Sequence, residues 1–134
     1  MSHARRVLLD THVWVWWRSD PAQLSAAATA AIDAAEQLGL SAISTFEIAA
    51  KAMRGKVHLD PDAATWVADA LVHPRLRLLD VTHPIAVRAA LLGSTWHHGD
   101  PADRILVATA LQWGWPVVSK DARIREAGLM PVIW

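Results

Sequence analysis

The stretch Val7-Leu8-Leu9-Asp10 decides how the rest of the chain is interpreted, because an uninterrupted apolar run ends there in a carboxylate. A short run of this kind is typical of a strand that is buried on both faces of a sheet. Another apolar segment, residues 13–17, follows almost at once. We therefore expect the Asp10 carboxylate to be largely buried and to need a partner.

Outward from this stretch, short apolar runs alternate with helical segments. Ser25 is a plausible helix N-cap, with Gly39 as the stop, and Ser44 is expected to open the next helix. Pro61 and Pro101 suit first turns. The expected strands are residues 7–10, 40–43, 76–81, 116–119 and 131–134, and the expected helices are residues 25–38, 44–53, 61–72, 84–92, 101–113 and 122–127. This alternation predicts the α/β class, with a mainly parallel sheet covered on both faces.

Length and composition indicate one ordinary globular domain, residues 1–134, with 53% hydrophobic and 19% charged residues. No cysteine is present, which excludes disulfides, zinc–thiolate sites and thiol nucleophiles. The 13 basic and 13 acidic residues cancel, which argues against coating nucleic acid by bulk charge but allows a nuclease with segregated charges. No signal peptide is evident and the longest uncharged run, residues 105–119, is too short to span a bilayer, so a soluble cytoplasmic protein is expected.

Four acids fall where the chain leaves an expected strand or enters a helix: Asp10, Glu47, Asp103 and Asp121. Ligands of open α/β sheets bind beyond the carboxyl ends of the strands. Clustered carboxylates need a cation, and an oxygen-only ligand set favours a hard ion such as Mg²⁺ or Mn²⁺. Phosphodiester hydrolysis is the chemistry that suits such a site.

Each acid also has an ordinary structural explanation. The run from Ser44 to Glu47 has the pattern of a capping box, in which the glutamate bonds the N-cap amide. Asp100, Asp103 and Asp121 would equally suit the positive ends of helices. Their spacing alone leaves a metal site and helix capping both open.

Four segments, taken in order, resemble the successive motifs of PIN domains, and most closely those of VapC-like toxins. They are residues 7–12 (VLLDTH), 41–49 (SAISTFEIA), 98–110 (HGDPADRILVATA) and 117–121 (VVSKD). The resemblance spans nearly the whole chain. It implies a three-layer α/β/α sandwich and Mg²⁺- or Mn²⁺-dependent endoribonuclease activity on RNA, as the toxin of a toxin–antitoxin pair.

The resemblance also implies roles for particular residues. Asp10, Glu47, Asp103 and Asp121 match the catalytic, metal-binding acids of the motifs. Thr11 and Ser119 would orient carboxylates or waters around them, and Asp100 would cap its helix beside the metal. Ser119 stands where many relatives have threonine, which keeps the hydroxyl.

Several basic residues lie close to these acids in sequence. Lys51 and Arg54 share a helix face with Glu47, and Arg104 and Lys120 neighbour Asp103 and Asp121. They are candidate RNA-binding residues that form a basic lip, to which Lys56, Arg123 and Arg125 would add. The alternatives are routine ion pairs: Lys51 with Glu47, and Arg104 with Asp100.

Trp14, Trp16 and Trp17 crowd one segment, and a single helix cannot bury all three on one face. We expect some of them to form an exposed apolar patch where a cognate antitoxin docks, with base stacking as the rarer alternative. An antitoxin arginine would then pair with the carboxylates, and the toxin would form a homodimer. The competing function is a non-catalytic PIN-like module that binds RNA or protein.

Overall fold

The computed structural model describes residues 5–96 and 100–134 and has five parallel strands in the order β3-β2-β1-β4-β5. The strands are β1 (Arg6–Leu9), β2 (Gln37–Ser41), β3 (Leu76–Leu79), β4 (Val117–Val118) and β5 (Val132–Ile133). The α-helices are α1 (Thr11–Ser19), α2 (Ala26–Ala34), α3 (Ala42–Met53), α4 (Ala63–Ala70), α5 (His83–Leu92), α6 (Pro101–Trp113) and α7 (Ala122–Ala127), and a short 3-10 helix spans Pro21–Gln23. The predicted α/β class and parallel sheet are confirmed.

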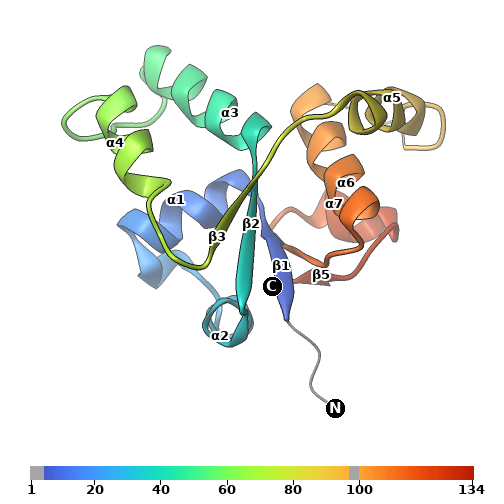
Figure 1. The fold of residues 1–134 in the computed structure, drawn as a ribbon, viewed down its shortest axis with the longest axis horizontal. Helices are drawn as coiled ribbons and strands as arrows, with labels where there is room; N and C mark the ends of the chain where they lie inside the picture. Colours follow the sequence, from blue (N-terminus) through green and yellow to red (C-terminus); the bar gives the residue numbers. More distant parts are fainter. Residues whose placement is uncertain (1–4, 97–99) are drawn as a thin grey trace.

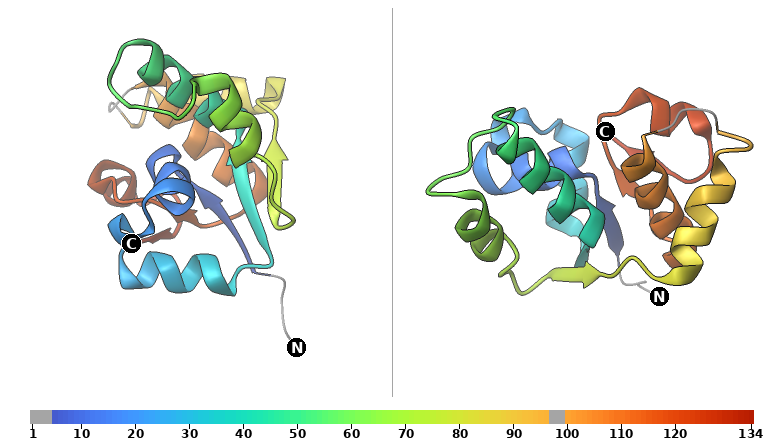
Figure 2. Two further views of the ribbon diagram at one scale, coloured as in Figure 1. Left: turned by 90° about the vertical axis from the view of Figure 1, so that its left-hand side faces the viewer. Right: turned by 90° about the horizontal axis from the view of Figure 1, so that it is seen from above.

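Helices cover both faces of this sheet, as Figures 1 and 2 show, with α1–α4 on one side and α5–α7 on the other. The alternation of side chains along β1 explains the two layers. Val7 and Leu9 belong to the core under α1 and α2, whereas Leu8 belongs to the core under α5 and α6. All three side chains are 5% exposed or less, so the strand is buried on both faces as its apolar run predicts.

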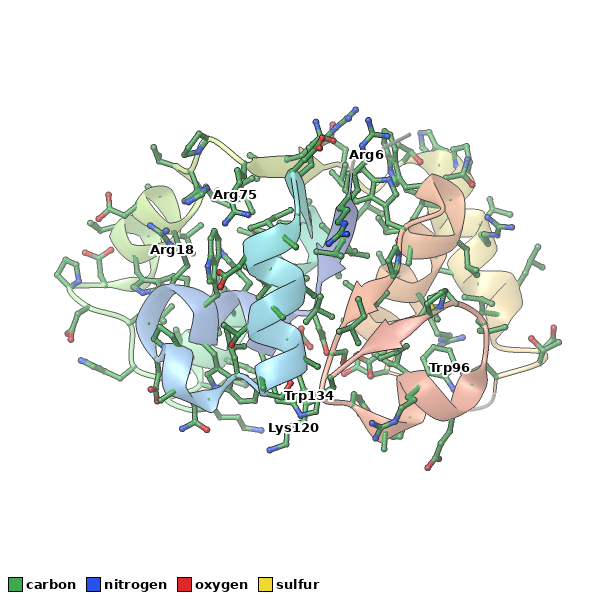
Figure 3. The ribbon with its side chains drawn as sticks, turned by 90° about the horizontal axis from the view of Figure 1, so that it is seen from below. Arg6, Arg18, Arg75, Trp96, Lys120 and Trp134 are labelled. Carbon is green, nitrogen blue, oxygen red and sulfur yellow. The ribbon has the colours of Figure 1, made fainter. Side chains whose placement is uncertain are left out.

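The predicted helix over residues 25–38 is wrong at its C-terminal end. Helix α2 stops at Ala34, and the following residues from Gln37 form β2 between β1 and β3. A long-range contact fixes this end, because Arg75 Nη1 donates to the carbonyls of Ile32 and Ala35 at 2.7 Å each (Arg75 is labelled in Figure 3). Gly39 therefore lies inside a strand rather than at a helix stop.

The expected helix start at Ser44 is also wrong. Helix α3 begins at Ala42, and Ser41 caps it by accepting a hydrogen bond from the Ile43 amide at 3.2 Å. Ser44 is instead buried within the helix, where its hydroxyl accepts a hydrogen bond from Thr11 Oγ1 at 2.8 Å. The capping-box interpretation of Glu47 is excluded by this register.

Smaller differences concern element ends and the membrane. Helix α4 begins after its N-cap Asp62 rather than at Pro61, and β3 ends at Leu79, two residues early. Residues 11–19, for which the sequence predicts no element, form α1 directly after Asp10.

Within the described part of the chain, no helix has the length and apolarity needed to cross a bilayer.

Candidate metal centre

The site lies where β1 and β4 end side by side. Leu9 pairs with Val118 in the sheet, so Asp10 and Ser119 leave their strands at the same level. The strand order reverses here, since β2 follows on one side of β1 and β4 on the other. In open α/β sheets this reversal opens a crevice at the carboxyl edge, and ligands bind there.

Asp10 is held rigidly at this edge. Its side chain is 9% exposed, its Oδ2 accepts a hydrogen bond from Ser119 Oγ at 2.6 Å, and its Oδ1 accepts one from the Thr11 amide at 2.7 Å. Burial raises the pKa of the Asp10 carboxyl, and the hydrogen bonds from Ser119 and Thr11 oppose that rise. The Ser119 hydroxyl also accepts from the Asp121 amide at 3.0 Å, so this one hydroxyl links the end of β1 to the segment between β4 and α7.

All four motif acids line one cavity of about 400 Å³ at this edge. They reach it from different elements: Asp10 from the end of β1, Glu47 from α3, Asp103 from the first turn of α6 and Asp121 from the N-cap of α7. Asp100 lines the same cavity while its Oδ1 caps α6 by accepting from the Ala102 amide at 2.9 Å. Helix capping and placement in the pocket therefore coexist in Asp100, as they do in Asp121.

The electrostatics of this cavity are strongly unfavourable for a further negative charge. The pKa of Asp103 is raised to about 7, first by burial and then by the nearby carboxylates of Asp10, Asp100, Glu47 and Asp121. A cluster of this kind is stabilised by a cation.

Arg123 supplies part of that positive charge. Its Nη2 lies 2.9 Å from Asp121 Oδ2 and 3.5 Å from Asp103 Oδ2, and its Nε donates to Asp121 Oδ1 at 3.1 Å. The side chain of Asp103 is 17% exposed, against 52% for that of Arg123, so a guanidinium from the surface reaches down to the acids.

The donor set fits a hard divalent ion, because it consists of carboxylate oxygens with no cysteine in the chain. Among residues 5–96 and 100–134, no three acids or histidines already surround one point as they would around a bound ion. Arg123 bridges two of the acids instead. Ion binding would therefore require this bridge to open and the carboxylates to converge.

Two of the four basic residues predicted to bind RNA line the acidic cavity. Lys51 Nζ lies 3.1 Å from His12 Nε2, and Lys120 Nζ lies 5.9 Å from the centre of the Trp16 ring. Arg54 lies outside it, in an adjoining hollow on α3.

The structure does not bring Arg104 to this cavity. Successive helical residues point about 100° apart, so Arg104 faces α5 while its neighbour Asp103 faces the acids. Its guanidinium packs over Gly93, where an added Cβ would lie 2.5 Å from Nη1.

The three tryptophans of α1 have different environments. Trp14 is fully buried, and its Nε1 donates to the carbonyl of Ala70 at 3.4 Å, so Trp14 is no part of an exposed patch. Trp16 and Trp17 are only partly buried, and Trp16 lines the acidic cavity together with His12. The position of His12 directly after Asp10 and Thr11 already indicates a place near the acids, whereas the sequence does not distinguish Trp16 from Trp14 and Trp17.

Comparison with known proteins agrees with this architecture. The PIN domain family matches residues 7–129. Ribonuclease VapC22 of Mycobacterium tuberculosis is 41% identical over 120 residues, which cover 90% of each chain.

Solved structures share the fold at low sequence identity. VapBC2 from Rickettsia felis, solved with a promoter DNA fragment, superposes with a TM-score of 0.71 at 11% identity, covering 95% of this chain and 96% of that one. FitAcB from Neisseria gonorrhoeae superposes with a TM-score of 0.66 at 24% identity, covering 94% and 95%. With the family match over residues 7–129 and the 41% identical relative, the chain is a member of the PIN-domain family, of the VapC type.

Proposed function

We propose that this protein is a metal-dependent endoribonuclease that acts as the toxin of a toxin–antitoxin pair. The observation that carries the proposal is the cavity at the carboxyl edge of the sheet, in which Asp103 lies together with four other carboxylates. Burial and these neighbouring carboxylates raise the pKa of Asp103 to about 7. Such an unfavourable arrangement of acids is typical of a functional site that binds a cation. The 41% identical relative is named a ribonuclease, which supports RNA as the substrate.

Asp10, Glu47, Asp103 and Asp121 are the residues that would hold Mg²⁺ or Mn²⁺. When bound, the ion supplies activation of a water and neutralisation of charge on the phosphate. Ser119 and Thr11 keep the Asp10 carboxylate oriented through their short hydrogen bonds.

The cations around the cavity would bind the phosphates of the RNA. Lys51 and Lys120 line the cavity itself, and Arg54 extends the basic side along α3. Arg123 can exchange Asp103 for a phosphate, because its 3.5 Å contact with Asp103 is the longest of its ion-pair contacts. These four side chains segregate positive charge at the site of a chain whose net charge is zero.

A cognate antitoxin would control the enzyme at the same place. Trp16 lines the cavity, is partly exposed and offers apolar area to a docking segment. Trp17 is also partly exposed, but its ring packs against His73 and Arg18 and does not line the cavity. Arg123 already demonstrates that a guanidinium can pair with Asp103 and Asp121 together, and an antitoxin arginine would compete for the same acids.

An exposed apolar face of α5 would form the interface of a homodimer. Val87 and Leu91 are 59% and 67% exposed and lie four residues apart, on one face of α5. Sedimentation of the wild-type protein and of Leu91→Glu tests this surface: a dimer that the charge dissociates supports it, and a monomeric wild type excludes it.

The activity is tested by incubating total RNA with the purified protein in Mg²⁺, Mn²⁺ or EDTA. We expect cleavage with either ion, none in EDTA, and a loss of at least about a hundredfold in Asp10→Asn, which keeps the shape of the ligand but removes its charge. Asp33→Asn, at an exposed position of α2 outside the cavity, is the matched control. RNA binding without cleavage under every condition would favour the non-catalytic module.

A further inference from the structure

The acidic cavity adjoins a second hollow on the surface of α3. This hollow, of about 290 Å³, shares Glu47, Lys51 and Asp100 with the acidic cavity. These three residues therefore lie where the two hollows meet, and Asp10, Asp103 and Asp121 lie on the side of the acidic cavity. We call the two adjoining hollows together the α3 groove.

One end of the α3 groove carries an exposed aromatic ring. Phe46, the only phenylalanine in the sequence, is 70% exposed. Ala50 follows four residues later on the same helix face, and Arg54 four residues after that. The small Ala50 side chain leaves open space between the ring and the guanidinium, and all three line the hollow.

The other end has a similar pairing of an aromatic ring with a cation. Trp16 lines the acidic cavity, and its ring lies 5.9 Å from Lys120 Nζ. Its orientation is set by His12, with ring centres 5.8 Å apart, and by Trp134, at 5.9 Å (Trp134 and Lys120 are labelled in Figure 3). Trp16 is therefore held in place by neighbours on its own side and still presents surface to the cavity.

We propose that Phe46 and Trp16 are nucleobase-stacking subsites on either side of the carboxylates, so that the α3 groove takes a single-stranded segment of nucleic acid. The proposal rests on the ribonuclease function and specifies the form of its substrate. Binding of single strands combines aromatic platforms for the bases with cations that follow the backbone. Here each platform shares its hollow with a cation: Arg54 lines the same hollow as Phe46, and Lys120 Nζ lies 5.9 Å from the centre of the Trp16 ring.

A paired duplex does not suit these two platforms. Bases in a helix are stacked on each other and paired at their edges, so their faces cannot reach Phe46 or Trp16 without unpairing. Two stacked bases would also position the phosphates between them, near Lys51 and the acids that both hollows share. The groove would thereby select unpaired nucleotides and orient the bond that is cut.

The test measures binding rather than cleavage. The probe is a fluorescein-labelled, unstructured oligoribonucleotide of about ten nucleotides, which is within the usual site size for single strands. Its affinity for the inactive Asp10→Asn protein is measured by fluorescence anisotropy in Mg²⁺, in combination with Phe46→Ala, Phe46→Leu, Trp16→Ala or Trp16→Phe. Met53→Ala is the matched control, because Met53 is 91% exposed on the same helix and lines neither hollow.

We expect Phe46→Ala and Trp16→Ala each to raise the Kd by about tenfold, within the range typical of lost base stacking. Trp16→Phe should retain most of the affinity, Phe46→Leu should not, and Met53→Ala should leave the Kd unchanged. Annealing the complementary strand should abolish binding at the same protein concentration. Replacing one base of the probe by an abasic site should weaken its binding to the Asp10→Asn protein. The same replacement should have no effect on the alanine variant that already lacks the aromatic ring on which that base stacks.

Unchanged affinity in both alanine variants, or equal binding of the duplex, would overturn the proposal. It would also be overturned if Phe46→Ala shifted the protein from dimer to monomer in sedimentation while the RNA affinity stayed constant, because Phe46 would then serve a protein interface. These outcomes are independent of catalysis. If the wild type cleaves RNA but both alanine variants bind it as tightly as their parent, the subsites are refuted and the ribonuclease function stands. If binding changes as expected but the wild type never cleaves RNA, the ribonuclease function is refuted and the subsites stand.

Discussion

Replacing Asp103 by asparagine should stabilise the protein when no divalent ion is present. The pKa of Asp103 is raised from 3.8 to about 7 by burial and by four neighbouring carboxylates. Its ionised form is therefore less favourable in the folded chain than in the unfolded one, and the cost appears as pH rises. Stability is lost progressively between about pH 4 and pH 7, and the full loss is present above pH 7.

The size of the effect follows from the same shift. A difference of about three pH units corresponds to about 4 kcal/mol at about 1.4 kcal/mol per unit. Water still reaches the side chain, which is 17% exposed, and screening reduces the gain to about 1–2 kcal/mol. An amide removes the charge but keeps the shape, so Arg123 can retain its stronger contacts with Asp121.

Urea unfolding of wild type and Asp103→Asn in EDTA, at intervals from pH 4 to pH 8, measures this difference. We expect it to be small near pH 4, to grow towards pH 7 and to stay level above it, whereas Asp33→Asn on exposed α2 should show no comparable trend. Saturating Mg²⁺ should stabilise the wild type more than the variant, since only the wild type has the complete ligand set. A variant that is no more stable than wild type at pH 8 would refute the argument from carboxylate repulsion.

Three further substitutions test the packing and charge around the site. Ser119→Ala removes the 2.6 Å hydrogen bond to Asp10 and should lower the free energy of urea unfolding by about 1–2 kcal/mol, with Ser119→Thr recovering most of it. Gly39→Ala should lower it by about 1–3 kcal/mol, because the added Cβ would lie 2.6 Å from a ring carbon of Trp115; an unchanged thermal midpoint would contradict this packing. Arg123→Ala should destabilise the ion-free protein at about pH 8 and enhance its thermal stabilisation by Mg²⁺, as the acids lose their resident cation; equal Mg²⁺ responses in variant and wild type would count against this role.

Two different kinds of sequence signal indicate the site residues. The apolar run before Asp10 and the proline and acid signals near residues 100–103 act over a few residues, so they indicate strand ends and helix starts directly. The four motif segments then singled out the acids by their order along the chain. The structure brings Asp10, Glu47, Asp103 and Asp121 to one cavity, and what they bind there remains a prediction.

The errors arose where a distant contact overrides a local signal. The alanine-rich segment after Ser25 favours a helix beyond residue 34, but pairing of β2 with β1 and β3 and the Arg75 contact to α2 end that helix early. Ser44 resembles a cap in its own sequence, yet a hydrogen bond from Thr11, 33 residues away, makes it part of the core.

Local sequence signals are enough to predict the α/β class, the order of most elements and the acids at their ends, because apolar periodicity and helix caps depend on near neighbours. The direction in which an individual side chain faces depends on how the elements pack. Trp14 is buried and donates a hydrogen bond to the Ala70 carbonyl, Arg104 faces α5, and Phe46 is exposed in the α3 groove. Each side chain of a helix points in a direction set by its position in the helix. Whether another element covers that side chain depends on segments that lie far away along the chain.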